Sequence, residues 1–116
     1  MQKRMLIAED NQATRDLLVS FAKSQGYDVS AVTNGVDLLT VVTFESFDVV
    51  ITDLIMADLN GTSAAEIMKM QGHTTPIIAL TGVSPQDPIL LNNKFTKIYH
   101  KPVDISELFN YLKSLL

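Results

Sequence analysis

Apolar residues along this chain follow two alternating patterns. Short runs rich in apolar and β-branched residues, typical of strands, cover residues 4–8, 27–32, 48–52, 76–80 and 97–100. The stretches between them repeat apolar residues every three or four positions, which predicts helices over 12–25, 36–44, 62–71 and 105–116. Residues 86–94 contain Pro88 and the pair Asn92-Asn93, so this stretch predicts only a short or irregular helix.

Local signals mark the ends of several predicted elements. Asn11 precedes the first helical stretch as an N-cap residue, and Gly26 follows it where a helix would stop. Asp104 and Glu107 have the spacing of a capping box at the start of the last helix. These signals agree with the periodicity, so the division into elements rests on two kinds of evidence.

The alternation of strands and helices predicts an α/β fold with a doubly wound, five-stranded parallel sheet and helices on both faces. For a chain of this length the flavodoxin-like strand order 2-1-3-4-5 is the natural candidate. In that order the first and third strands are neighbours, so their carboxyl ends share one edge of the sheet. Glu9 and Asp10 follow the first strand, Asp53 follows the third, and Lys101 follows the fifth.

Three carboxylates at one edge repel one another, and their clustering costs free energy unless a cation and a reaction require it. Mg²⁺ prefers carboxylate and phosphate oxygens as ligands. Taken singly, each residue has a plainer interpretation: Glu9 and Asp10 as a helix cap, Asp53 as a turn residue, Lys101 as a surface lysine. Their convergence at the edge where open α/β sheets bind ligands favours a site that holds a cation and supports a reaction.

Composition and charge narrow the classes of function. The 116 residues are 47% apolar and 19% charged, which predicts one globular domain. The net charge of −4 and the lack of a basic run argue against direct binding of nucleic acid. No apolar stretch approaches the roughly 20 residues of a membrane span. The absence of cysteine fits a reducing cytoplasm, where we expect the protein to be located.

The chain resembles the receiver domain of two-component response regulators, with the CheY-like fold. Four motifs carry the resemblance: Glu9-Asp10 after the first strand, residues 53–61 after the third, residues 80–82 after the fourth, and Lys101-Pro102 after the fifth. They occur in order and at suitable spacing. The resemblance extends over nearly the whole chain, which implies a single receiver domain over residues 1–116.

The resemblance implies a role for each site residue. Asp53 would accept a phosphoryl group from a phosphohistidine, and Lys101, after which a cis peptide bond is expected, would pair with that group. Thr81 would move its hydroxyl to a phosphoryl oxygen. The implied Mg²⁺ ligands are Asp10 directly, Glu9 often through water, Asp53, and the backbone carbonyl of Ile55.

The resemblance also implies partners. A histidine kinase or a histidine phosphotransfer protein would supply the phosphoryl group, and an unidentified output protein or domain would respond to it. We expect a monomer or weak dimer that acts as a switch rather than as a turnover enzyme.

The sequence departs from the usual receiver pattern at several positions. Ile98 stands where a switch Tyr or Phe is usual, and Tyr99, one position later, should point to the opposite face of its strand. Ala57 replaces a common proline. Ile55 and Val83 are apolar at two positions that influence how water reaches the acyl phosphate, which predicts slow self-dephosphorylation.

Other interpretations stay open at this point. The chain could be a receiver-like interaction module that works without phosphorylation, or a receiver excised from a hybrid histidine kinase. A phosphatase of the haloacid dehalogenase type would need a second Asp where Ile55 stands. We expect His73 and His100 to be structural or surface residues. The methionines predicted to fill the core are Met5, Met56, Met68 and Met70.

Overall fold

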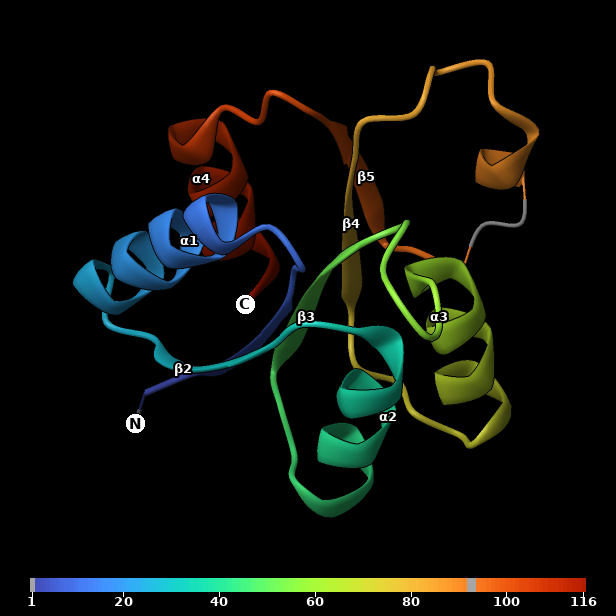
Figure 1. Cartoon of the computed structure of the whole chain (residues 1–116). Coiled ribbons are helices and arrows are strands. Elements are labelled where there is room, and N and C mark those ends of the chain that lie inside the picture. The colour runs from blue at the N-terminus through green and yellow to red at the C-terminus, as the bar shows by residue number, and fades with distance from the viewer. Residues whose placement is uncertain (1, 92–93) are drawn as a thin grey trace.

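A parallel sheet of five strands runs through the middle of the molecule in the order β2-β1-β3-β4-β5 (Figure 1). The computed structural model describes residues 2–91 and 94–116. The strands are β1 (Arg4–Ala8), β2 (Asp28–Val32), β3 (Val49–Asp53), β4 (Ile77–Thr81) and β5 (Lys97–His100). The predicted fold class and strand order are confirmed, with boundaries shifted by one residue at several ends.

Helices cover both faces of the sheet, as predicted. Helices α1 (Gln12–Ser24) and α4 (Ile105–Leu115) lie on one face, and α2 (Gly35–Phe44) and α3 (Gly61–Met70) lie on the other (Figure 1). Side chains alternate along each strand, so β1 supplies both apolar layers. Leu6 belongs to the layer under α2 and α3, and Met5 and Ile7 belong to the layer under α1 and α4.

Helix caps form where the sequence signals them. The side chain of Asn11 accepts a hydrogen bond from the backbone N–H of Thr14 at 2.9 Å. Asp104 accepts one from the N–H of Glu107 at 3.1 Å and so begins α4. Gly26 follows α1 with a φ of 91°, a left-handed conformation that glycine adopts without steric cost. The contacts of Asn11 and Asp104 satisfy N–H groups that a helix start leaves unpaired.

The connection between β4 and β5 contains a short 3₁₀ helix, η1 (Pro88–Leu91), and no α-helix in its described part. The sequence predicted a short or irregular helix near 86–94, of which residues 92 and 93 lie outside the described residues. Pro88 lacks the N–H that an α-helix would use, so an α-helix through this point would lose a hydrogen bond. Ile89 and Leu90 nevertheless pack against the apolar layer that includes the buried Phe95.

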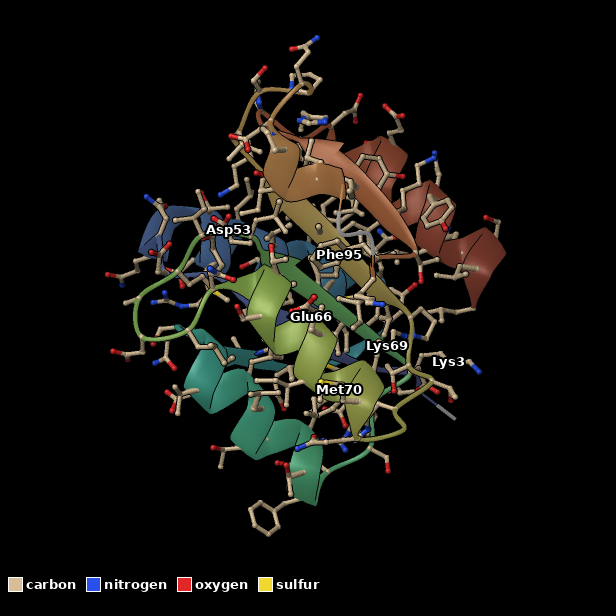
Figure 2. The ribbon with its side chains drawn as sticks, turned by 90° about the vertical axis from the view of Figure 1, so that its right-hand side faces the viewer. Lys3, Asp53, Glu66, Lys69, Met70 and Phe95 are labelled. Atoms are coloured by element: carbon tan, nitrogen blue, oxygen red, sulfur yellow. The ribbon has the colours of Figure 1, made fainter. Side chains whose placement is uncertain are left out.

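One methionine prediction is wrong. Met5, Met56 and Met68 are buried, but Met70 is 85% exposed at the end of α3 (Figure 2). Met68 faces the sheet, and a residue two positions further along a helix is turned about 200° away from it.

Within the described residues, no helix combines the length and apolarity that crossing a membrane requires.

The loop from β3 to α3 passes very close to the first residue of that helix. Gly61 donates its backbone N–H to the carbonyl oxygen of Leu54 at 2.8 Å. A Cβ atom on Gly61 would collide with the carbonyl oxygen of Asp53. Only glycine therefore lets α3 start directly beneath the end of β3, where Asp53 lies.

We predict that Gly61→Ala destabilises the protein by about 1–3 kcal/mol, because overpacking against fixed backbone outweighs the better helix propensity of alanine. Chemical denaturation measures the change in the free energy of unfolding. Gly82→Ala is the matched control, since a Cβ there meets no atom within 4 Å. Equal free energies of unfolding for Gly61→Ala and the wild type would contradict this explanation.

Candidate functional site

Three carboxylates meet at the carboxyl edge of the sheet, as the predicted strand order requires. Glu9 and Asp10 follow β1, and Asp53 is the last residue of the neighbouring β3. One carboxylate oxygen from each residue lies within 4.8 Å of the other two. Glu9 is 1% exposed and Asp53 is 9% exposed, whereas Asp10 is open to solvent.

Lys101 reaches into this acidic cluster from the end of β5. Its Nζ donates to Oε1 of Glu9 at 2.7 Å and to Oδ2 of Asp53 at 2.8 Å. Its backbone N–H donates to the carbonyl oxygen of Thr81 at 2.7 Å, which holds the ends of β4 and β5 together. The peptide bond from Lys101 to Pro102 is cis, as expected. One ammonium group therefore bridges two carboxylates from different strands.

Burial and neighbouring charges shift the pKa values of Glu9 and Lys101. Burial raises the pKa of Glu9, and the negative charge of Asp53 raises it further against the opposing hydrogen bond from Lys101. Burial also lowers the pKa of Lys101, but the hydrogen bonds and charges of Asp53 and Glu9 outweigh it, so that pKa is raised. Lys101 therefore keeps its positive charge, whereas ionisation of Glu9 costs more free energy here than it would in water.

The two carboxylate oxygens of Asp53 have different partners. Oδ2 accepts from Lys101, and Oδ1 accepts from the backbone N–H of Ile55 at 3.2 Å. The side chain of Ile55 is 58% exposed. Figure 2 shows Asp53 at the end of its strand, above the start of α3. Its carboxylate is thus held in a fixed orientation at the rim of the sheet.

Thr81 ends β4 next to Asp53. Leu80 is the register partner of Asp53, so Thr81 lies one step beyond it on the adjacent strand. Thr81 is completely buried, and its hydroxyl oxygen accepts a hydrogen bond from the backbone N–H of Val83 at 3.0 Å. The sheet therefore brings Thr81 to the predicted edge, with its hydroxyl engaged by the loop that follows.

Arg15 is a site residue that the sequence analysis missed. Its Nη1 donates to the backbone carbonyl of Glu9 at 3.0 Å and lies 3.4 Å from that of Asp10. A cation near the start of a helix is unfavourable beside the positive end of the helix dipole. The unfavourable position of Arg15 near the start of α1 could have indicated in the sequence that its side chain makes a specific contact. It holds the loop that carries two of the carboxylates.

Four further residues named in the sequence analysis lie outside the acidic cluster. Ile98 and Tyr99 pack into opposite apolar layers, as the alternation of β5 predicted. His73 lines a hollow with Val42 and Phe47, outside the acidic cluster. His100 instead lies at the carboxyl end of β5 and contacts the loop after Thr81.

The donor set of the cluster fits a hard divalent cation. All three residues of the cluster offer carboxylate oxygens, the ligands that Mg²⁺ binds in proteins, and no softer nitrogen or sulfur ligand belongs to the group. The exposed Asp10 leaves one side open to water, which Mg²⁺ retains in its coordination shell. Lys101 neutralises one of the three negative charges and leaves the rest for a cation.

The chain is similar in sequence to several known proteins. Transcription factor SKN7 of Candida albicans is 29% identical over 114 residues, which are 97% of this chain and 20% of that protein. The chain thus spans about a fifth of the length of this relative. Sporulation initiation phosphotransferase F of Bacillus subtilis is 28% identical over 118 residues, covering 100% of this chain and 95% of that protein.

A solved structure has the same fold. The receiver domain of a sensor histidine kinase of Pseudomonas aeruginosa, whose structure has a magnesium ion coordinated in the active site cleft, superimposes with a TM-score of 0.90. The two chains are 25% identical, and the match covers 99% of this chain and 98% of the other. The model of the response regulator receiver domain family matches residues 5–113. The chain therefore belongs to the response regulator receiver domain family.

Proposed function

We propose that Asp53 is the phosphoacceptor of a phosphorelay and that the domain works as a switch rather than as a turnover enzyme. The observation that supports this proposal is the bridge from Lys101 to both Glu9 and Asp53, with Asp10 beside it. A carboxylate that only capped a helix would not need two further carboxylates and a lysine around it. Such a cluster is what transfer of a doubly charged group requires.

In the proposed reaction an oxygen of Asp53 attacks the phosphorus atom of a phosphohistidine. A new P–O bond forms, the P–N bond breaks, and the imidazole nitrogen of the donor leaves with the electron pair. Lys101, which already holds Oδ2 of Asp53, then donates a hydrogen bond to the incoming phosphoryl oxygen. Mg²⁺ bound by Asp10, Asp53, the carbonyl of Ile55, and Glu9 through water would neutralise the charge of the phosphoryl group.

Thr81 would report the change. Its hydroxyl now accepts from Val83 but also carries a proton of its own, which it can donate to a phosphoryl oxygen. Rotation of the side chain toward that oxygen would shift the population of the loop after β4 between two conformations. The proposed output is therefore a change in this loop that a partner recognises.

The proposed phosphoryl donor is a histidine kinase or a histidine phosphotransfer protein. The names of the relatives support this class of partner, since one is a phosphotransferase and another is part of a sensor histidine kinase. An output protein or domain would read the switch. We propose a cytoplasmic location because phosphoryl donors of this class would be met there.

The test is intact-protein mass spectrometry after incubation with acetyl phosphate, with and without Mg²⁺. We expect the wild type to gain one phosphoryl group only when Mg²⁺ is present, because the carboxylates repel the donor without it. Asp53→Asn should gain none. Asp58→Asn is the control, since Asp58 lies in the loop after Asp53 but outside the acidic cluster. No gain in the wild type would contradict the proposal and favour a module that works without phosphorylation.

We predict that the acyl phosphate on Asp53 is hydrolysed slowly, with a half-life of many minutes. Neither Ile55 nor Val83 carries a polar group that orients an attacking water molecule. Ile55→Asn should shorten the half-life several-fold, as followed by loss of the phosphoryl mass over time. Val36→Asn, at an apolar residue of α2 that is 49% exposed, is the matched control. A wild-type half-life of seconds would overturn the prediction.

A further inference from the structure

His100 and Thr81 both contact Val83, a residue of the loop after β4. Its ring atom Nδ1 lies 3.2 Å from the carbonyl oxygen of Val83. The backbone N–H of Val83 donates to the hydroxyl oxygen of Thr81. Val83 is therefore tied at its N–H to the end of β4 and at its carbonyl to the end of β5.

The chemistry of this contact fixes the state of the ring. A carbonyl oxygen only accepts hydrogen bonds, so Nδ1 of His100 must carry a proton. A neutral ring then has its free electron pair on Nε2. The ring is exposed, and an exposed hydrogen bond is weak because water competes for both partners. The contact is thus one that a small rearrangement of the loop can break.

The backbone around this contact is held independently. Thr81 and His100 are register partners in the sheet, and the N–H of Lys101 donates to the carbonyl of Thr81 at 2.7 Å. The ends of the two strands therefore stay together whether or not the ring contacts Val83. The side chain of His100 is the part of this junction that is free to change.

Ile98 lies two residues earlier on the same face of β5 and packs into the apolar layer under α2 and α3. The side chain of Ile98 has no polar atom, so it cannot form a hydrogen bond with the loop after β4. His100 is the next residue on that face, and it does make one. The contact between β5 and the loop after β4 accordingly includes a polar bond at His100.

We propose that His100 is a positioning residue that holds the loop after β4 in its resting conformation through Val83. When Thr81 turns its hydroxyl away from the N–H of Val83, the loop moves and the bond from His100 to the carbonyl of Val83 breaks. This inference rests on the proposed phosphorylation of Asp53. It assigns to β5 a polar contact that opposes the switch until the phosphoryl group is present.

The first arm of the test observes the ring in the wild-type protein. Nitrogen-15 NMR of the histidine rings, before and after acetyl phosphate with Mg²⁺, identifies which ring nitrogen carries the proton. We expect His100 to be protonated at Nδ1 in the resting state and to lose that signature on phosphorylation. His73 is the internal control and should not change. A neutral ring protonated at Nε2 in the resting state, or an unchanged ring in phosphorylated protein, would overturn the inference.

The second arm changes the side chain and measures the initial rate of phosphorylation. His100→Leu removes the bond and should raise the rate about twofold to threefold, the lower end of the range for one hydrogen bond made only in the resting state, because this bond is exposed. His100→Asn keeps an N–H near the position of Nδ1 and should restore the wild-type rate. His73→Leu is the matched control. Equal rates for His100→Leu and the wild type, or an Asn variant that behaves like Leu, would contradict the role.

The outcomes separate this inference from the proposed function. If the wild type gains no phosphoryl mass, both fail. If it gains the mass while the ring of His100 and the variant rates stay unchanged, only the role of His100 fails. Thermal unfolding of each variant identifies any that does not fold, and the ring measurement on the wild type then decides.

Discussion

The site depends on one ammonium group placed between two carboxylates from different strands. Lys101 contacts Glu9 and Asp53 at hydrogen-bond distance, while Asp10 adds a third negative charge beside them. Because burial raises the pKa of Glu9, its ionised form is less favourable in the folded protein than in the unfolded chain. Its contribution to stability is therefore full below the ordinary Glu range and declines as the pH rises through the raised pKa. The protein maintains this cluster at a cost in stability, as expected of a functional site.

The parallel sheet makes the cluster possible. Neighbouring strands β1 and β3 deliver the carboxylates to one edge, and β4 and β5 deliver Thr81 and Lys101. Two apolar layers fix the backbone of the strands, so the carboxyl edge of the sheet keeps its geometry. Gly61 lets α3 begin against the backbone of Asp53. The proposed switch would need such a rigid edge together with a loop that can rearrange.

Much of this arrangement follows from the sequence, because strand order alone brings Glu9, Asp10 and Asp53 together. Side-chain contacts in loops do not follow in the same way. The reach of Arg15 back to the carbonyls of Glu9 and Asp10 depends on the geometry of a single loop, and the bond from His100 to Val83 depends on one rotamer. The exposure of Met70 was mistaken because apolar character was given more weight than its position on the helix. The roles of the site residues in catalysis and metal binding stay predictions.

The central claim is that a divalent cation balances the charge that Lys101 leaves uncompensated. Thermal unfolding with and without Mg²⁺, at constant ionic strength, tests it most directly. At free Mg²⁺ a hundred times its dissociation constant, we predict about 2.7 kcal/mol of added stability for the wild type. The same addition should stabilise Asp10→Asn much less, and Asp16→Asn, an exposed residue of α1 outside the cluster, as much as the wild type. An unfolding midpoint that Mg²⁺ does not raise in the wild type would contradict the account.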